Sequence, residues 1–135
     1  MKVLMLYVST NMSRDGRLWY YDEGAASLAA SLEAAGHAVA FHMVSPSDGE
    51  DEVGAWVEAQ RAEPERTLIV FLTSLLFSAY GHDVPDALRP ALCLRERTGI
   101  VTAMAGLYAT LNTEDLLAHP GIDFVGRGEM DEALV

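Results

Sequence analysis

The chain has 135 residues, half of them hydrophobic, and a mean hydropathy of +0.14, which suffices for one domain with a closed core and argues against disorder. Twenty acidic residues against nine basic ones give a formal net charge of -11, which would repel nucleic-acid phosphates and anionic lipid. The single cysteine, Cys93, excludes an internal disulfide and a Cys-rich zinc or iron–sulfur site built by this chain alone.

The first predicted element is a strand over residues 3–8, "VLMLYV", a continuous apolar run of the kind that is buried on both faces of a sheet. The run is too short to cross a membrane, and no small-residue cleavage pattern follows it. We therefore predict a cytoplasmic protein with no membrane partner and, from its charge, no direct nucleic-acid partner.

Helices and strands then alternate along the chain. The helix that opens at Asp22 places Leu28 and Leu32 four residues apart and has Gly36 as its stop signal. The elements predicted after it are a strand at 37–44, a helix from Glu50, a strand at 67–73, a helix near 83–97, a strand at 99–104, a short helix from Thr113 and a strand at 122–126. The chain therefore contains five strands separated by four helices.

This alternation predicts an α/β fold, because each right-handed crossover returns its helix to a face of a parallel sheet. We expect a flavodoxin-like (Rossmann-like) doubly wound domain over residues 1–135, with five parallel strands in the order 2-1-3-4-5. The final "GEMDEALV" has the pattern of a fifth helix about to begin. We therefore expect the domain to be the N-terminal part of a longer protein.

In such sheets the ligand binds outside the carboxyl ends of the strands, which directs attention to the loop after each strand. The first loop, 9–22, is long and begins with Ser9, Thr10 and Asn11, and loops of this length tend to carry function. The third begins at Thr73 and continues with "SLLF", an apolar stretch that requires a covering partner or ligand.

The fourth loop contains Gly106, which has no Cβ and would let a ligand touch the main chain. The fifth contains Gly126 and Gly128 on either side of Arg127, followed by Glu129. This last loop imitates part of a dinucleotide-binding fingerprint but has Asp131 where the third glycine belongs, so that motif is not indicated.

Two of these loops resemble motifs of cobalamin-binding domains, which carry SxL after the third strand and a glycine pair after the fourth. Here Ser74-Leu75-Leu76 and Ala105-Gly106 are separated by 28 residues. The chain is more closely similar to the N-terminal cobalamin-binding domain of radical SAM enzymes. "AGLYATLNTEDLL", "GIDFVGRGEMDEAL" and "GAASLAASLEAAGHAV" resemble segments of that family in the same order, and together they extend over nearly the whole chain.

The resemblance implies that Ser74 lies near the nucleotide tail of cobalamin, that Leu76 lines its slot, and that Gly106 lets the tail pass close to the main chain. Three positions depart from the pattern, since Ala105 replaces a glycine, Tyr108 a histidine and Met130 a glycine. The implied cofactor-binding residues, taken with their neighbours in the loops, are Ser9, Thr10, Asn11, Thr73, Ser74, Leu76, Ala105, Gly106, Leu107, Tyr108, Thr110, Gly126, Gly128 and Glu129.

The loop at 9–22 contains no histidine, whereas related domains that ligate cobalt do so through a His in this loop. We therefore expect cobalamin to bind with no protein His on cobalt. The radical SAM motif CxxxCxxC is absent from the chain. The iron–sulfur cluster and S-adenosylmethionine would accordingly belong to a radical SAM domain in cis or in trans, and no catalytic activity is expected from this chain alone.

Two other functions remain open from the sequence. One is a flavodoxin-like carrier in which Ser9, Thr10, Asn11 and Ser13 cradle the phosphate of FMN. The other is a cofactor-free interaction module with a decayed cobalamin site, in which the apolar stretch 75–77 docks another domain.

Overall fold

A computed structural model describes residues 1–8, 23–44, 50–60, 63–73 and 84–128 of the chain. Its elements, in chain order, are β1 (Lys2–Val8), α1 (Glu23–Ala34), β2 (Ala38–Val44), α2 (Glu50–Gln60), the 3₁₀ helix η1 (Pro64–Arg66), β3 (Thr67–Thr73), α4 (Val84–Thr98), β4 (Val101–Ala105), α5 (Leu107–Leu111), α6 (Thr113–Leu117) and β5 (Phe124–Val125).

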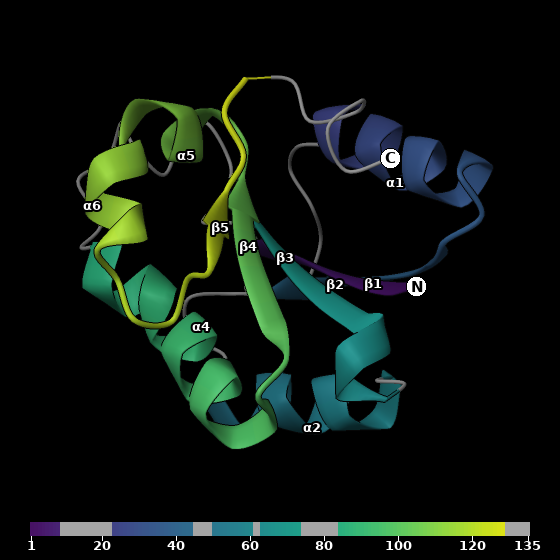
Figure 1. Cartoon of the computed structure of the whole chain (residues 1–135), viewed down its shortest axis with the longest axis horizontal. Coiled ribbons are helices and arrows are strands. Elements are labelled where there is room, and N and C mark those ends of the chain that lie inside the picture. Colours follow the sequence, from purple (N-terminus) through teal and green to yellow (C-terminus); the bar gives the residue numbers. More distant parts are fainter. Residues whose placement is uncertain (9–22, 45–49, 61–62, 74–83, 129–135) are drawn as a thin grey trace, which may run out of the picture.

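The five strands form one all-parallel sheet in the order β2-β1-β3-β4-β5 (Figure 1). β1 pairs with β2 and with β3 along its whole length. The predicted flavodoxin-like α/β fold and its strand order are therefore confirmed. β1 and β3 are central strands, and the strand order reverses between them.

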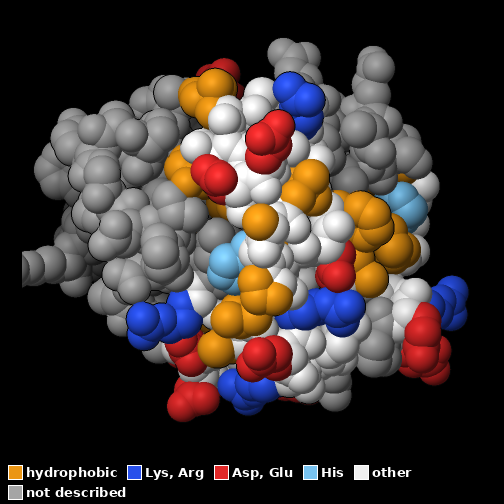
Figure 2. Space-filling model, turned by 60° about the vertical axis from the view of Figure 1, so that its left-hand side comes forward, with side chains coloured by type: hydrophobic (Ala, Val, Ile, Leu, Met, Phe, Trp, Pro, Cys, Tyr) orange, Lys and Arg blue, Asp and Glu red, His pale blue; other side chains and the backbone are white. Residues whose placement is uncertain are grey.

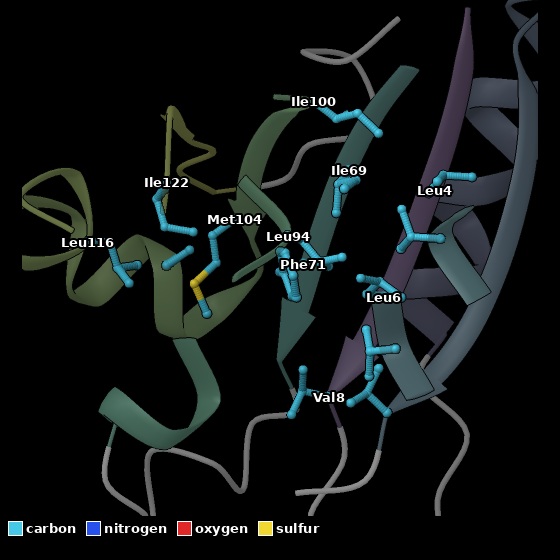
Figure 3. Close-up of a cluster of buried hydrophobic side chains, with 14 of the residues drawn as sticks. Leu4, Leu6, Val8, Ile69, Phe71, Leu94, Ile100, Met104, Leu116 and Ile122 are labelled. Atoms are coloured by element: carbon cyan, nitrogen blue, oxygen red, sulfur yellow. The ribbon is translucent and has the colours of Figure 1, made fainter. Parts of the chain in front are cut away.

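Each face of the sheet has its own apolar core. Alternate β1 residues Leu4 and Leu6 join the larger core, which contains side chains of α2, α4, α5 and α6, while Val3 and Met5 join the core under α1. Figure 3 shows the larger core, which contains side chains of β1, β3 and β4 together with Leu94 of α4 and Leu116 of α6. β1 is thus buried on both faces, as its continuous apolar run predicts.

The end of α1 follows the predicted stop signal. Gly36 has φ 86°, and its N–H donates to the Glu33 carbonyl at 2.9 Å while the His37 N–H donates to the Leu32 carbonyl at 3.0 Å. These bonds satisfy carbonyls of the last helical turn, and glycine adopts the left-handed φ without a steric penalty. The chain leaves the helix there and enters β2.

The segment after β4 differs from the prediction of a single short helix from Thr113. Helix α5 already begins at Leu107, and α6 begins at Thr113. Between them Asn112 leaves the helical conformation, with φ -122°, and donates to the Tyr108 carbonyl through its backbone N–H and its side-chain amide, both at 3.0 Å. The helix is thus interrupted at Asn112, whose side chain adds a second hydrogen bond to the last turn of α5.

The last strand is shorter than the predicted range 122–126. Only Phe124 and Val125 are paired as strand residues, although the N–H groups of Asp123 and Gly126 still donate to β4 carbonyls at 2.9 and 2.8 Å. The predicted fifth helix falls on residues 129–135, outside the described residues.

A charged network holds the amino ends of β4 and β5 together. The Asp123 carboxylate accepts a hydrogen bond from the N–H of fully buried Thr102 at 2.9 Å and lies 3.0 Å from the Arg95 guanidinium. Arg95 also donates to the Gly99 carbonyl at 2.9 Å. One carboxylate thus satisfies a buried backbone donor and links β5 to α4.

Candidate functional site

The carboxyl ends of the parallel strands meet at one edge of the sheet. The register pairs Val8 with Thr73 and Leu72 with Ala105, so the ends of β1, β3 and β4 lie side by side. The sequence-based site residues that follow β1 and β3, together with one after β5, lie outside the described residues: Ser9, Thr10, Asn11, Ser74, Leu76 and Glu129. The described part of the edge is therefore formed mainly by the loops after β4 and β5.

Gly106 forms the turn directly after β4. Its φ of 102° and ψ of -175° fall in a region of backbone conformation that is essentially restricted to glycine. The Gly106 carbonyl accepts hydrogen bonds from the N–H and from the hydroxyl of Thr110, both at 3.1 Å. Glycine is required here by the backbone itself, in addition to the close approach predicted from the sequence.

Thr110 joins the loop after β4 to the loop after β5. Its hydroxyl accepts a hydrogen bond from the Gly128 N–H at 2.8 Å while donating to the Gly106 carbonyl. Gly128 has φ 75°, and the neighbouring Gly126 N–H donates to the Met104 carbonyl. Gly106, Thr110, Gly126 and Gly128, which the sequence suggests separately, are thus brought together.

Other predicted site residues on α5 and β4 differ in exposure. Ala105 is buried in the core under α1, and Tyr108 is buried in the larger core on the opposite face. Burial raises the pKa of the Tyr108 phenol, and the nearby Asp115 carboxylate raises that pKa further, so the ring remains neutral. Leu107, by contrast, is 42% exposed. Contact of Ala105 or Tyr108 with a ligand stays a prediction.

A polar hollow of about 300 Å³ lies beside this turn and includes a cation that the sequence reasoning did not select. Its lining consists of Thr110, Leu111, Asn112, Thr113, Glu114, Asp115 and Arg127. Figure 2, in which the side carrying α5 and α6 comes forward, shows acidic and basic side chains close together near the top. The signal that could have selected Arg127 is its position between two glycines.

Comparisons with known proteins do not assign the chain to a family. No model of a known protein family matches it, and no curated protein is similar to it at a significant level. Across the ranges that the structure describes, no group of three or more His, Cys, Asp or Glu side chains is arranged to hold a metal ion. None of the helices in those ranges has the length and apolar character needed to cross a membrane.

Proposed function

We propose that this domain binds cobalamin at the carboxyl edge of its sheet and presents it to a radical SAM domain, in the same chain or in a partner chain. The observation that carries the proposal is the glycine-only turn at Gly106, directly at the end of β4. The fold supports the same position, because ligands of doubly wound sheets bind outside the carboxyl ends of the strands. The resemblance of Ser74-Leu75-Leu76 and Ala105-Gly106 to cobalamin motifs agrees with it.

Gly106 fits a cofactor that approaches the main chain closely. The residue is partly exposed, has no side chain, and is held by two hydrogen bonds from Thr110. Because these bonds come from the chain itself, they fix the conformation of the turn, and a turn fixed in this way loses less conformational freedom on association. The turn therefore favours a bulky ligand part lying against the backbone.

Cobalamin, when bound, would supply the methyl-transfer chemistry that the resemblance implies. The chain's own residues would bind and orient it, with Ser74 near the nucleotide tail, Leu76 along the slot and Gly106 under the tail. The cluster and S-adenosylmethionine would come from the radical SAM domain.

Exposed apolar side chains near the same edge support the partner domain in this proposal. Leu107 is 42% exposed and Leu111 is 67% exposed, on the short helix that begins at the glycine turn. A single exposed leucine is common on protein surfaces, but two beside a candidate ligand site fit a surface that a second domain covers.

The proposal is tested by ultrafiltration of the purified chain with hydroxocobalamin and, in parallel, with FMN. We expect corrinoid absorbance to be retained with the protein and FMN to pass through. A corrinoid spectrum without the signature of imidazole ligation would agree with binding without a protein His on cobalt.

The competing functions give different results in the same experiment. Retention of FMN alone would favour the flavodoxin-like carrier. Retention of neither compound would contradict the proposal and favour the cofactor-free interaction module, for which a Leu76→Asp variant should release a bound partner domain.

A further inference from the structure

We infer that Thr110 is a positioning residue, whose hydroxyl fixes the loop after β5 against the glycine turn after β4, at which the proposed cofactor binds. The inference rests on the proposed function and gives Thr110, which the resemblance implies as a cofactor-binding residue, a role that does not need contact with the ligand. It starts from one observation: the Thr110 hydroxyl donates to the Gly106 carbonyl at 3.1 Å and accepts from the Gly128 N–H at 2.8 Å.

The bond to Gly128 spans 18 positions of sequence and connects two separate turns. Gly106 and Gly128 both have positive φ, at 102° and 75°, so each loop changes direction at the residue that Thr110 holds. Within residues 84–128, the Gly126 N–H donates to the Met104 carbonyl two positions before the Gly128 contact. Loss of the hydroxyl would remove the hydrogen bond that joins Gly128 to the loop after β4.

Thr98 provides a matched control at the opposite end of β4. Its hydroxyl likewise donates to a carbonyl four residues earlier, that of Leu94 at 2.6 Å, and accepts from an N–H, that of Ile100 at 3.2 Å. The two threonines therefore make the same pair of bonds, but Thr98 accepts from a residue only two positions away. Valine replaces either threonine with nearly unchanged shape and helix propensity.

The experiment compares Thr110→Val, Thr110→Ser and Thr98→Val with the wild-type chain. Hydroxocobalamin affinity is measured by titration, and exchange of the Gly128 and Ile100 amide protons is followed by NMR. We expect Thr110→Val to weaken binding by about two- to ten-fold, the effect of one hydrogen bond, and to speed Gly128 exchange. Thr110→Ser should retain the wild-type affinity and the wild-type rate of Gly128 exchange. Thr98→Val should speed only the exchange of the Ile100 amide proton.

The outcomes separate the positioning role from the proposed function. Faster Gly128 exchange in Thr110→Val with wild-type affinity would overturn the positioning role and leave cobalamin binding standing. Equal weakening by Thr98→Val would also overturn it, because the loss would then follow from general destabilisation. Failure of the wild-type chain to bind would overturn the proposed function and the positioning role together.

Discussion

At the amino end of β4 the chain is held by charge, whereas at the carboxyl end the contacts between the described parts of the loops after β4 and β5 are neutral hydrogen bonds. Arg95 and Asp123 form an ion pair at 3.0 Å, and the same carboxylate accepts from the buried Thr102 N–H. At the other end, the Thr110 hydroxyl connects Gly106 to Gly128. The difference leads us to expect that the amino end contributes mainly to stability, while the carboxyl end contributes mainly to holding the turn proposed to bind the ligand.

The largest expected effect on stability is at the amino end. Asp123→Ala removes the acceptor of a buried backbone N–H and leaves Arg95 without its carboxylate, so we expect a loss of about 3 kcal/mol in the free energy of unfolding. Urea denaturation of the variant measures the loss. Hydroxocobalamin affinity should not change while the protein is folded, and a loss of affinity in the folded variant would break the proposed division between the two ends.

We expect Gly106→Ala to lower the free energy of unfolding by less than Asp123→Ala does. Unlike Asp123→Ala, it should also prevent hydroxocobalamin from binding. Alanine at φ 102° and ψ -175° is strained by about 2 kcal/mol, and its methyl group would occupy the position that the cofactor approaches. Gly99→Ala is the control, because Gly99 has φ 65° at the amino end and an added Cβ would meet no atom within 4 Å. Calorimetry and hydroxocobalamin titration of both variants test this: equal ligand affinities would contradict the placement of the cofactor.

The smallest expected effect is at Cys93, which lies on α4 and takes part in the contacts at neither end of β4. The Cys93 thiol donates to the Glu50 carboxylate at 3.1 Å, and this bond, followed by burial and the negative charges of Glu50 and Glu96, raises the thiol pKa despite the opposing charge of Arg89. We expect slow alkylation of Cys93 by iodoacetamide near pH 8 and faster alkylation in Glu50→Gln. Equal rates in the two proteins would contradict the assigned cause.

The raised pKa of the Cys93 thiol also makes the stability of the folded chain depend on pH in a defined direction. Because the thiol pKa is higher in the folded chain than in the unfolded chain, its contribution is fully present below about pH 9 and is lost as pH rises through the folded pKa. In the Glu50→Gln variant, stability should fall less as pH rises through this range. Thermal unfolding measured as a function of pH tests this expectation.

The sequence was sufficient for the elements whose structure depends on local pattern. The run at 67–73 coincides with β3, and Gly36 ends α1 as expected, because burial and a left-handed glycine both leave direct marks in the sequence. The start of α5 was missed because Gly106 and the residues that follow it were interpreted as a ligand loop. The helix ends at Asn112, where φ is -122°.

The candidate site was only partly predictable for a different reason. Gly106 and Gly128 are recognisable individually, but the hydroxyl between them depends on the β4–β5 register, which places residues 18 positions apart in contact. No local pattern encodes that distance. The role of Asp123 is non-local as well, since its partners come from β4 and α4.

The central claim, that cobalamin binds at the carboxyl edge, is tested most directly by NMR of the backbone amides during titration with hydroxocobalamin. Four glycines with positive φ serve as reporters, Gly106 and Gly128 at the carboxyl edge and Gly36 and Gly99 at the amino edge. We predict that binding shifts the resonances of Gly106 and Gly128 and leaves those of Gly36 and Gly99 in place. Shifts confined to Gly36 and Gly99, or no shifts at saturating hydroxocobalamin, would contradict the claim.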